Sequence, residues 1–227
     1  MLEWLIVGGG IHGTHLALVL IQGAGVEHER IRVVDPHAEP LARWHACTAN
    51  TGMAFLRSAA VHHIDLHSDA LTQFAKAPAG KPFARFVEPY RRPSVDLFRA
   101  HALDVIERSG VQQCWTTDRV CGIQRINGGW QVASTAGSME ARQVVLAMGA
   151  GEQPAWPLWA QSLGMMDAPI HHVFAPALPH QSRPVASCRC CWWRYFGSPN
   201  RIGISRTATA KRDTADAPCP TQASTRQ

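Results

Sequence analysis

The first part of the chain follows the order apolar run, glycine-rich turn, helix, apolar run. Leu2 to Val7 is a short apolar run of strand length, and Gly8-Gly9-Gly10-Ile11-His12-Gly13 follows it at once. Thr14 to Gln22 then carries apolar residues at helical spacing. A second apolar run, Ile31 to Val34, ends at Asp35. This order predicts two parallel strands joined by a helix.

A second block of regular patterning begins at Ser94. This residue precedes apolar positions at helical spacing, and Gly110 is the expected stop, so we predict an amphipathic helix between them. Val144 to Met148 has the pattern of a buried strand that ends in a turn at Gly149. Between the helix and this strand lie three strand-like runs, Val111 to Trp115, Val120 to Ile126 and Trp130 to Thr135, the last two joined by the hairpin residues Asn127-Gly128-Gly129.

Together these patterns predict an α/β fold, a Rossmann-like parallel sheet with helices and an inserted antiparallel β-meander. We expect a nucleotide-binding domain over residues 1–157 and a connecting segment over 158–182. The remaining residues, 183–227, form a tail with no periodic apolar face.

The glycine turn has the spacing of a dinucleotide-binding site. Gly8, Gly10 and Gly13 match G-x-G-x-x-G, in which the first glycine allows the tight turn, the second allows close approach of a pyrophosphate, and the third lets helix pack on strand. Ile11 and His12 lie within this motif, at the helix N-terminus that favours anions. A glycine cluster alone also makes ordinary turns, but the flanking strand and helix favour the nucleotide site.

Asp35 lies about 20 residues beyond the glycines, where an acidic side chain can accept hydrogen bonds from a ribose diol. Its charge would repel a phosphate on the ribose, which favours FAD or NAD over NADP at this site. Taken alone, Asp35 is equally typical of a turn before Pro36.

The order of elements resembles the flavoproteins with two dinucleotide-binding domains, whose FAD domain inserts a β-meander before returning to the parallel sheet. The resemblance implies that Gly149 lies near the flavin and that Val120 presents its backbone to the adenine. A plain NAD-dependent dehydrogenase is another possible interpretation of the glycine motif, but such enzymes do not show this order of elements. Cys47 has no partner four or five residues on, so a disulfide reductase of the same superfamily is disfavoured.

A closer resemblance covers residues 1 to 175. Arg43-Trp44-His45, Gly52 to Ser58, Arg92-Pro93-Ser94 and Gly149 to Pro154 look like the flavin-dependent monooxygenases that hydroxylate the amines of lysine and ornithine. The resemblance implies FAD as the bound cofactor, contacts to it from Trp44, NADPH as the reductant of an intact parent enzyme, and a small-molecule substrate, an amine. It assigns no catalytic residue.

Several polar residues have two interpretations. Arg57 and Arg92 are candidate contacts for phosphate, flavin or an anionic substrate, although surface arginines are more often solvated. His62, His63 and His67 lack a carboxylate or cysteine at metal-site spacing, and we expect no metal site.

The excess positive charge lies in the tail. The chain has a net charge of +5, but residues 1–180 hold 14 basic and 15 acidic side chains, and the tail also holds four of the seven cysteines, Cys188, Cys190, Cys191 and Cys219. A shift of one base turns the codons of Trp192 and Trp193 into glycine codons and permits another strand, glycine turn and helix there. We infer a frameshifted or truncated product that has lost a second nucleotide-binding domain.

We accordingly expect an FAD-binding oxidoreductase fragment, with a non-catalytic FAD- or NAD-binding module as the alternative. No apolar stretch is long enough to span a bilayer, and no secretion signal is recognisable, so we expect a cytoplasmic protein without a membrane partner. Because the basic excess is confined to the tail, we expect no nucleic-acid partner.

Overall fold

The computed structural model describes residues 1–149, 154–165 and 170–175. The contacts of the chain divide it at His180, and all described residues belong to the first unit, Met1–His180. The predicted boundaries at residues 157 and 182 stay predictions.

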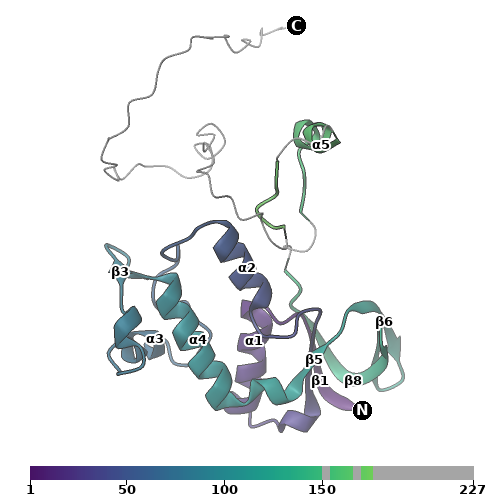
Figure 1. Ribbon diagram of the computed structural model, residues 1–227. Helices are drawn as coiled ribbons and strands as arrows, with labels where there is room; N and C mark the ends of the chain where they lie inside the picture. Colours follow the sequence, from purple (N-terminus) through teal and green to yellow (C-terminus); the bar gives the residue numbers. More distant parts are fainter. Residues whose placement is uncertain (150–153, 166–169, 176–227) are drawn as a thin grey trace, which may run out of the picture. The chain divides into compact units, whose positions relative to one another are not determined.

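The fold is built on one sheet of six strands, in the order β5-β2-β1-β8-β7-β6 (Figure 1). Four neighbours, β5, β2, β1 and β8, run parallel, whereas β8, β7 and β6 pair antiparallel. The strands are β1 (Leu2–Val7), β2 (Ile31–Asp35), β5 (Trp115–Thr117), β6 (Val120–Ile126), β7 (Gly129–Ser134) and β8 (Gly137–Leu146). This arrangement confirms the predicted fold class.

Strand β8 belongs to both parts of the sheet. Its first half pairs antiparallel with β7, from Gly137 opposite Ser134 to Ala141 opposite Trp130. Its second half pairs parallel with β1, ending with Leu146 opposite Val7. The antiparallel strands therefore continue directly into the parallel sheet.

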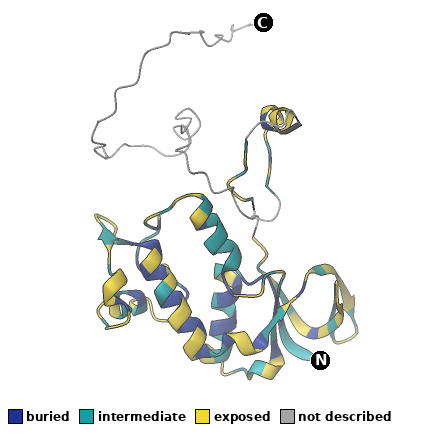
Figure 2. Ribbon diagram, viewed as in Figure 1, coloured by how far each residue is buried: buried dark blue, intermediate teal, exposed yellow. Residues whose placement is uncertain are grey.

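Strands β1 and β2 are covered on both faces, which explains why they read as continuous apolar runs. On one face, Ile6 and Val33 pack with residues of α1 (Ile11–Leu18) and α4 (Val95–Ser109). On the other face, Leu5 and Val34 pack with Val132 of β7. Figure 2 shows buried residues along α1, α4 and the parallel strands. The run Val144 to Met148, predicted as a buried strand, is only partly buried, because Leu146 is 59% and Met148 60% exposed.

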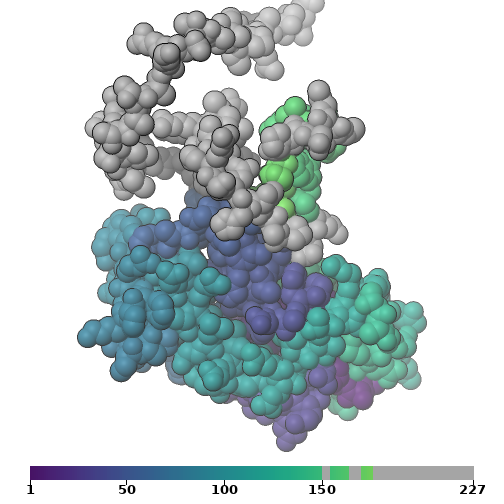
Figure 3. All heavy atoms as spheres, in the orientation of Figure 1, coloured from purple at the N-terminus to yellow at the C-terminus, as the bar shows by residue number. Residues whose placement is uncertain are grey.

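The remaining elements are short and connect this framework. In the space-filling view, α2 lies at the surface between the α3–α4 side and the antiparallel strands (Figure 3). These elements are the π-helical turn η1 (Val19–Gly23), the 3-10 turns η2 (His28–Arg30), η3 (Lys81–Phe83) and η4 (Val111–Cys114), the helices α2 (Ala42–Asn50), α3 (Ala70–Phe74) and α5 (Leu158–Met165), and the paired strands β3 (Phe86–Val87) and β4 (Arg92–Pro93).

Helix α4 begins and ends where the sequence predicts. The Ser94 hydroxyl oxygen accepts a hydrogen bond from the Leu97 N–H at 3.2 Å, which caps the helix N-terminus. Gly110 adopts a left-handed conformation with φ of 68°, which ends the helix.

One predicted strand is wrong. Val111 to Trp115 was expected to be the first strand of the meander, but residues Val111–Cys114 form a 3-10 turn, and β5 begins only at Trp115. Strand β5 pairs parallel with β2, and β8 supplies the third strand of the meander instead. The apolar run arises because Val111 and Cys114 are fully buried beneath the sheet edge, not because they belong to a strand.

Candidate functional site

In the glycine loop between β1 and α1, backbone atoms leave no room for a side chain at the first and third glycines of the motif. A Cβ atom at Gly13 would lie 1.8 Å from the carbonyl oxygen of Gly8. A Cβ atom at Gly8 would lie 2.6 Å from the carbonyl oxygen of Ala147, and Gly8 has a φ of 104°. The first and third glycines of the motif thus serve the tight turn and the helix-strand contact, as predicted.

Gly10 differs from these two glycines. It is the N-cap residue of α1, no side chain caps this helix, and its first turn holds no acidic residue. A Cβ atom at Gly10 would have no neighbour within 4 Å, so the space beside this backbone is open. Ile11 and His12 form the first turn, whose backbone N–H groups favour an anion. These residues fit a pyrophosphate.

Asp35, predicted to accept hydrogen bonds from a ribose, contacts the protein's own backbone. Its Oδ2 atom accepts from the Gly9 N–H at 2.6 Å, and its Oδ1 atom accepts from the His37 N–H at 2.9 Å. The side chain of Asp35 is 13% exposed. The carboxylate therefore joins the end of β2 to the glycine loop.

The other predicted contacts lie at the same end of the sheet. Gly149 follows Met148, whose Cα would lie 2.9 Å from a Cβ atom at Gly8. Val120 begins β6, two residues after Asp118, whose N–H donates to the Asp35 carbonyl at 3.0 Å. In open α/β sheets, ligands bind outside the carboxyl ends of the strands, where these residues lie. Their roles in cofactor binding stay predictions.

A cavity of about 700 Å³ adjoins the N-terminus of α1. Ile11 and His12 form one side of it, and Trp44 of α2 lines it as well. The ring of Trp44 packs against Phe98 of α4, with ring centroids 4.7 Å apart. Further lining residues come from segment 53–68, among them Met53, Leu56, Arg57, His62 and His63. The cavity thus combines an apolar wall with a helix N-terminus and polar side chains.

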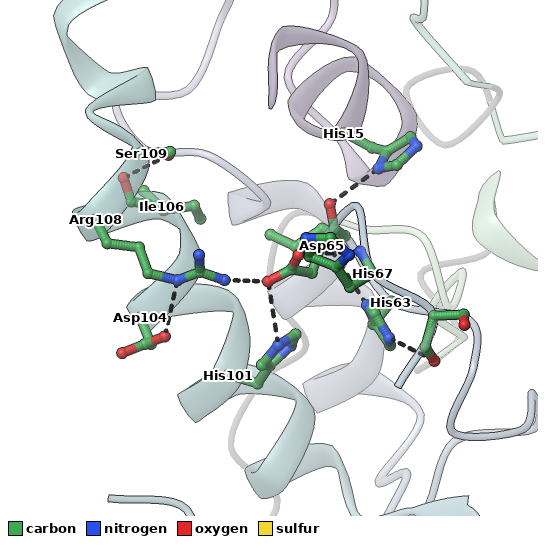
Figure 4. A network of polar contacts seen from close by, with 11 residues as sticks. His15, His63, Asp65, His67, His101, Asp104, Ile106, Arg108 and Ser109 are labelled. Atoms are coloured by element: carbon green, nitrogen blue, oxygen red, sulfur yellow. Dashed lines mark hydrogen bonds and ion pairs between the residues drawn. The ribbon is translucent and has the colours of Figure 1, made fainter. Parts of the chain in front are cut away.

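Segment 53–68 is held in place by a buried polar network that the sequence did not reveal (Figure 4). The Asp65 carboxylate pairs with Arg108 of α4, and the His101 Nε2 atom lies 3.9 Å from the same oxygen. The His15 ring nitrogen of α1 contacts the Ile64 carbonyl at 2.9 Å. Because the partners are far apart in the sequence, no local pattern could have identified this network.

Burial governs ionisation in this network. It lowers the pKa of His101 from 6.5 to about 4, and the charges of His63 and Arg108 act in the same direction. Burial on its own would raise the pKa of Asp65, but the hydrogen bond from the His67 N–H and the Arg108 charge outweigh it and lower this pKa. His101 is therefore neutral and Asp65 charged at neutral pH.

The three histidines considered as metal ligands have other roles. His63 stacks edge-on against His101, with ring centroids 5.1 Å apart, and its Nε2 atom contacts the Ser68 carbonyl at 3.2 Å. The His67 N–H donates to Asp65, and His62 lies exposed in the cavity wall. Within the described ranges, no group of three or more His, Cys, Asp or Glu side chains is placed to hold a metal ion.

The segments that carry the two candidate arginines are joined, because the Leu56 N–H donates to the Pro93 carbonyl at 2.9 Å. Arg57 lines the cavity, whereas Arg92 belongs to β4, outside the residues that line it. Cys47 lies in α2 as a free thiol.

Within the part of the chain described, no helix has both the length and the apolar character needed to cross a membrane.

A family model described as FAD-NAD(P)-binding matches residues 5–151. The match covers the glycine loop, Asp35, the cavity and the antiparallel strands. It confirms the expected cofactor class, FAD with a nicotinamide dinucleotide, and the relation to FAD/NAD(P)-binding flavoproteins. The match does not show whether the chain belongs with the lysine and ornithine hydroxylases within this family.

Several solved structures are similar to this chain at low identity. Cyclohexanone monooxygenase from Rhodococcus sp. Phi1 bound to NADP+ is 14% identical, with a TM-score of 0.49, over 68% of this chain and 27% of that one. An oxidized steroid monooxygenase bound to NADP is 18% identical, with a TM-score of 0.46, over 65% and 26%. Bacillithiol disulfide reductase from Staphylococcus aureus is 12% identical, with a TM-score of 0.41, over 65% and 38%.

The matched region of this chain thus spans between about a quarter and two fifths of these proteins. A search of curated proteins returns no match.

Proposed function

The chain belongs to the FAD-NAD(P)-binding family, and from this membership we propose that it is the FAD-binding part of an NADPH-dependent flavin monooxygenase. The intact protein would hydroxylate a small molecule, an amine by the resemblance of residues 1 to 175 to amine hydroxylases. When bound, FAD would supply the redox chemistry with NADPH and oxygen.

The observation that carries the proposal is the open space beside Gly10. A Cβ atom there meets nothing within 4 Å, although Gly8 and Gly13 on either side are packed against backbone. A pyrophosphate beside Gly10 would receive the N-terminal N–H groups of α1, where Ile11 and His12 form the first turn.

The cavity supports a cofactor longer than ADP. Ile11 and His12 line it together with Trp44, Leu56 and Phe98, so a ligand that extends beyond the pyrophosphate into this cavity would contact apolar side chains. In our proposal these side chains exclude water from the reacting atoms and hold an aromatic ring by packing. FAD fits this shape better than NAD, because its flavin ring is larger and more apolar.

The test compares two glycine-to-alanine variants of the full chain. In Gly10→Ala the new methyl group occupies open space, so folding stability should change little, while FAD affinity should fall by about tenfold or more. Gly122→Ala in β6 is the matched control, because its Cβ would meet only Ala133 at 4.0 Å. It should leave FAD affinity unchanged.

The measurement starts with the visible absorption spectrum of the purified chain and identification of any released cofactor. FAD titration by flavin fluorescence then gives the affinity of each variant. A wild-type chain that neither retains nor takes up FAD overturns the proposal. A chain that retains FAD but never reacts with NADPH, even with added nicotinamide-binding partners, would favour a non-catalytic module.

A further inference from the structure

We propose that His63 is a positioning residue whose neutral imidazole ring shapes one wall of the cofactor cavity, and that protonation of this ring weakens FAD binding at mildly acidic pH. The inference rests on the proposed function, since it takes FAD as the ligand of the cavity. It goes beyond that function because it concerns the conditions under which the cavity holds its ligand.

The two ring nitrogens of His63 have different partners. Nδ1 accepts a hydrogen bond from the Asp65 N–H at 3.2 Å, so this nitrogen cannot carry a proton. Nε2 lies 3.2 Å from the carbonyl oxygen of Ser68, which can only accept, so Nε2 is the donor. A neutral ring with its proton on Nε2 satisfies both contacts. The imidazolium form carries protons on both nitrogens and cannot accept from Asp65.

These two hydrogen bonds hold a part of the cavity wall. His63, Asp65, Leu66 and Ser68 all line the cavity. The His63 ring lies between the Asp65 N–H and the Ser68 carbonyl and so closes a loop over residues 63–68 (Figure 4). The shape of this wall therefore depends on both contacts of the ring.

Protonation breaks the contact at Nδ1. A proton on this atom would point at the Asp65 N–H across the same 3.2 Å, and two donors repel each other. Asp65 is buried, and a buried donor that loses its acceptor costs free energy. The charged ring must therefore leave its position, or the loop over residues 63–68 must change shape. Either change alters the wall of the cavity and weakens the packing around FAD.

Charged and titratable groups approach the His63 ring from its own segment and from three helices: Asp65, Asp69 at the start of α3, His15 of α1 and His101 of α4. Arg108 of α4 pairs with Asp65. The ring is thus surrounded by both carboxylates and other basic groups.

Burial and the neighbouring groups together lower the pKa of His63 from its usual 6.5. Burial has the largest effect. A backbone hydrogen bond and the charges of Asp65 and Asp69 oppose it, and His15 adds to it. The pKa of His101 is about 4, so this neighbour stays mostly uncharged at mildly acidic pH. His63 is therefore neutral at neutral pH and takes up its proton only below pH 6.5.

The test is FAD binding to the full chain freed of flavin, measured by equilibrium dialysis between about pH 8 and pH 5. The Kd of the wild-type chain should be constant down to about pH 6.5 and then rise, by about fivefold or more at pH 5, because one proton is taken up when FAD leaves. Circular dichroism at each pH checks that the chain is folded. A Kd that does not change with pH overturns the inference.

Two variants separate the roles of the ring nitrogens. In His63→Asn the side-chain oxygen can accept from the N–H two residues further along the chain, and it does not titrate. This variant should bind FAD within about threefold of the wild type at neutral pH and keep that affinity at acidic pH. His63→Gln can reach the Ser68 carbonyl but places no acceptor beside Asp65, so its Kd should exceed that of the wild type by about fivefold or more at neutral pH.

The matched control is His67→Asn in the same segment. The His67 side chain is exposed, and His67 is not among the residues that line the cavity. This variant should show both the wild-type Kd and its rise at acidic pH. A rise of the wild-type size in His63→Asn would show that another group is responsible and would overturn the inference.

A measurement without ligand separates this inference from the proposed function. NMR of the histidine ring nitrogens should show the neutral His63 ring protonated on Nε2, and the Asp65 amide resonance should shift with the same midpoint as this ring. A neutral ring protonated on Nδ1, or an Asp65 amide that does not follow the titration, overturns the inference. Failure of the wild-type chain to bind FAD at every pH overturns the proposed function, and the NMR result still decides whether His63 holds the wall.

Discussion

Gly13 offers the sharpest test among single residues. Its Cβ would lie 1.8 Å from the Gly8 carbonyl oxygen. Because that oxygen belongs to the backbone and a Cβ is bonded directly to its own Cα, neither atom can move aside without opening the loop. We expect Gly13→Ala to lower the free energy of unfolding by about 3 kcal/mol. Urea denaturation measures this change, and Gly122→Ala should unfold like the wild-type chain. Equal midpoints for Gly13→Ala and the wild type would contradict the packing described for the loop.

His101 makes stability depend on pH. Its pKa falls from 6.5 to about 4 because it is buried, while Asp65 and Asp104 oppose that shift and His63 and Arg108 add to it. The unfolded chain therefore binds more protons between these values. The contribution of the neutral, buried His101 to the free energy of unfolding is fully present above about pH 6.5. It is lost as the pH falls toward 4, and the loss amounts to about 3 kcal/mol in total.

The check is the free energy of unfolding from urea titrations at several pH values. His101→Phe should reduce the acid sensitivity, because the phenyl ring keeps the contact with Phe74, now 5.4 Å between centroids, and carries no proton. His62→Gln is the control, since the His62 side chain is exposed in the folded chain. The same pH dependence in wild type and His101→Phe would exclude His101 as its source.

Sequence patterns predicted the glycines of the site but not the partners of its charged groups. Gly8, Gly10 and Gly13 have the spacing that their backbone contacts require. The sequence identified the carboxylate of Asp35 as part of the site. Its hydrogen-bond donor, the Gly9 N–H, lies 26 residues away in the chain, and only the folded loop brings the two together. The pair of Asp65 with Arg108 has no local signature for the same reason.

Among the elements, α4 depends on its N-terminal cap. The Ser94 hydroxyl accepts from Leu97 and donates to the Phe83 carbonyl at 3.0 Å, and the residue is fully buried. We expect Ser94→Ala to lower the free energy of unfolding by about 1 to 2 kcal/mol, since both polar contacts are lost. Thermal unfolding followed by circular dichroism measures this loss. Ser94→Thr keeps the hydroxyl and should recover most of it, whereas equal loss in both variants would show that the cap is not the cause.

Element types were predictable wherever several residues repeat a pattern. Strand β1, the first helix and α4 each show a period or a cap, and the hairpin of β6 and β7 has turn residues between two apolar runs. Strand β5 has only three residues, and its run begins in the buried turn at Val111. A strand of three residues is too short for its apolar pattern to indicate whether it pairs with β2 or with the strands of the meander.

For the whole molecule, the described core uses residues from Leu5 to Ala160. The sequence after residue 182 shows no periodic apolar face, so we propose that the fold does not depend on it. Deleting residues 183–227 should leave the unfolding midpoint and FAD affinity nearly unchanged. Calorimetry and flavin titration of the shortened chain test this. A marked loss of stability would show that the tail contributes structure and would count against a shifted reading frame.

Because β8 pairs with both β7 and β1, its position restricts where the chain can gain or lose residues. An insertion in the turn between β7 and β8 lengthens a hairpin loop and leaves the second half of β8 in register with β1. An insertion after Ala141 instead displaces Ala147, whose N–H donates to the Val7 carbonyl at 2.8 Å and whose carbonyl lies against Gly8. Natural variation in length should therefore be found in the hairpin and be absent from the five residues that precede Ala147.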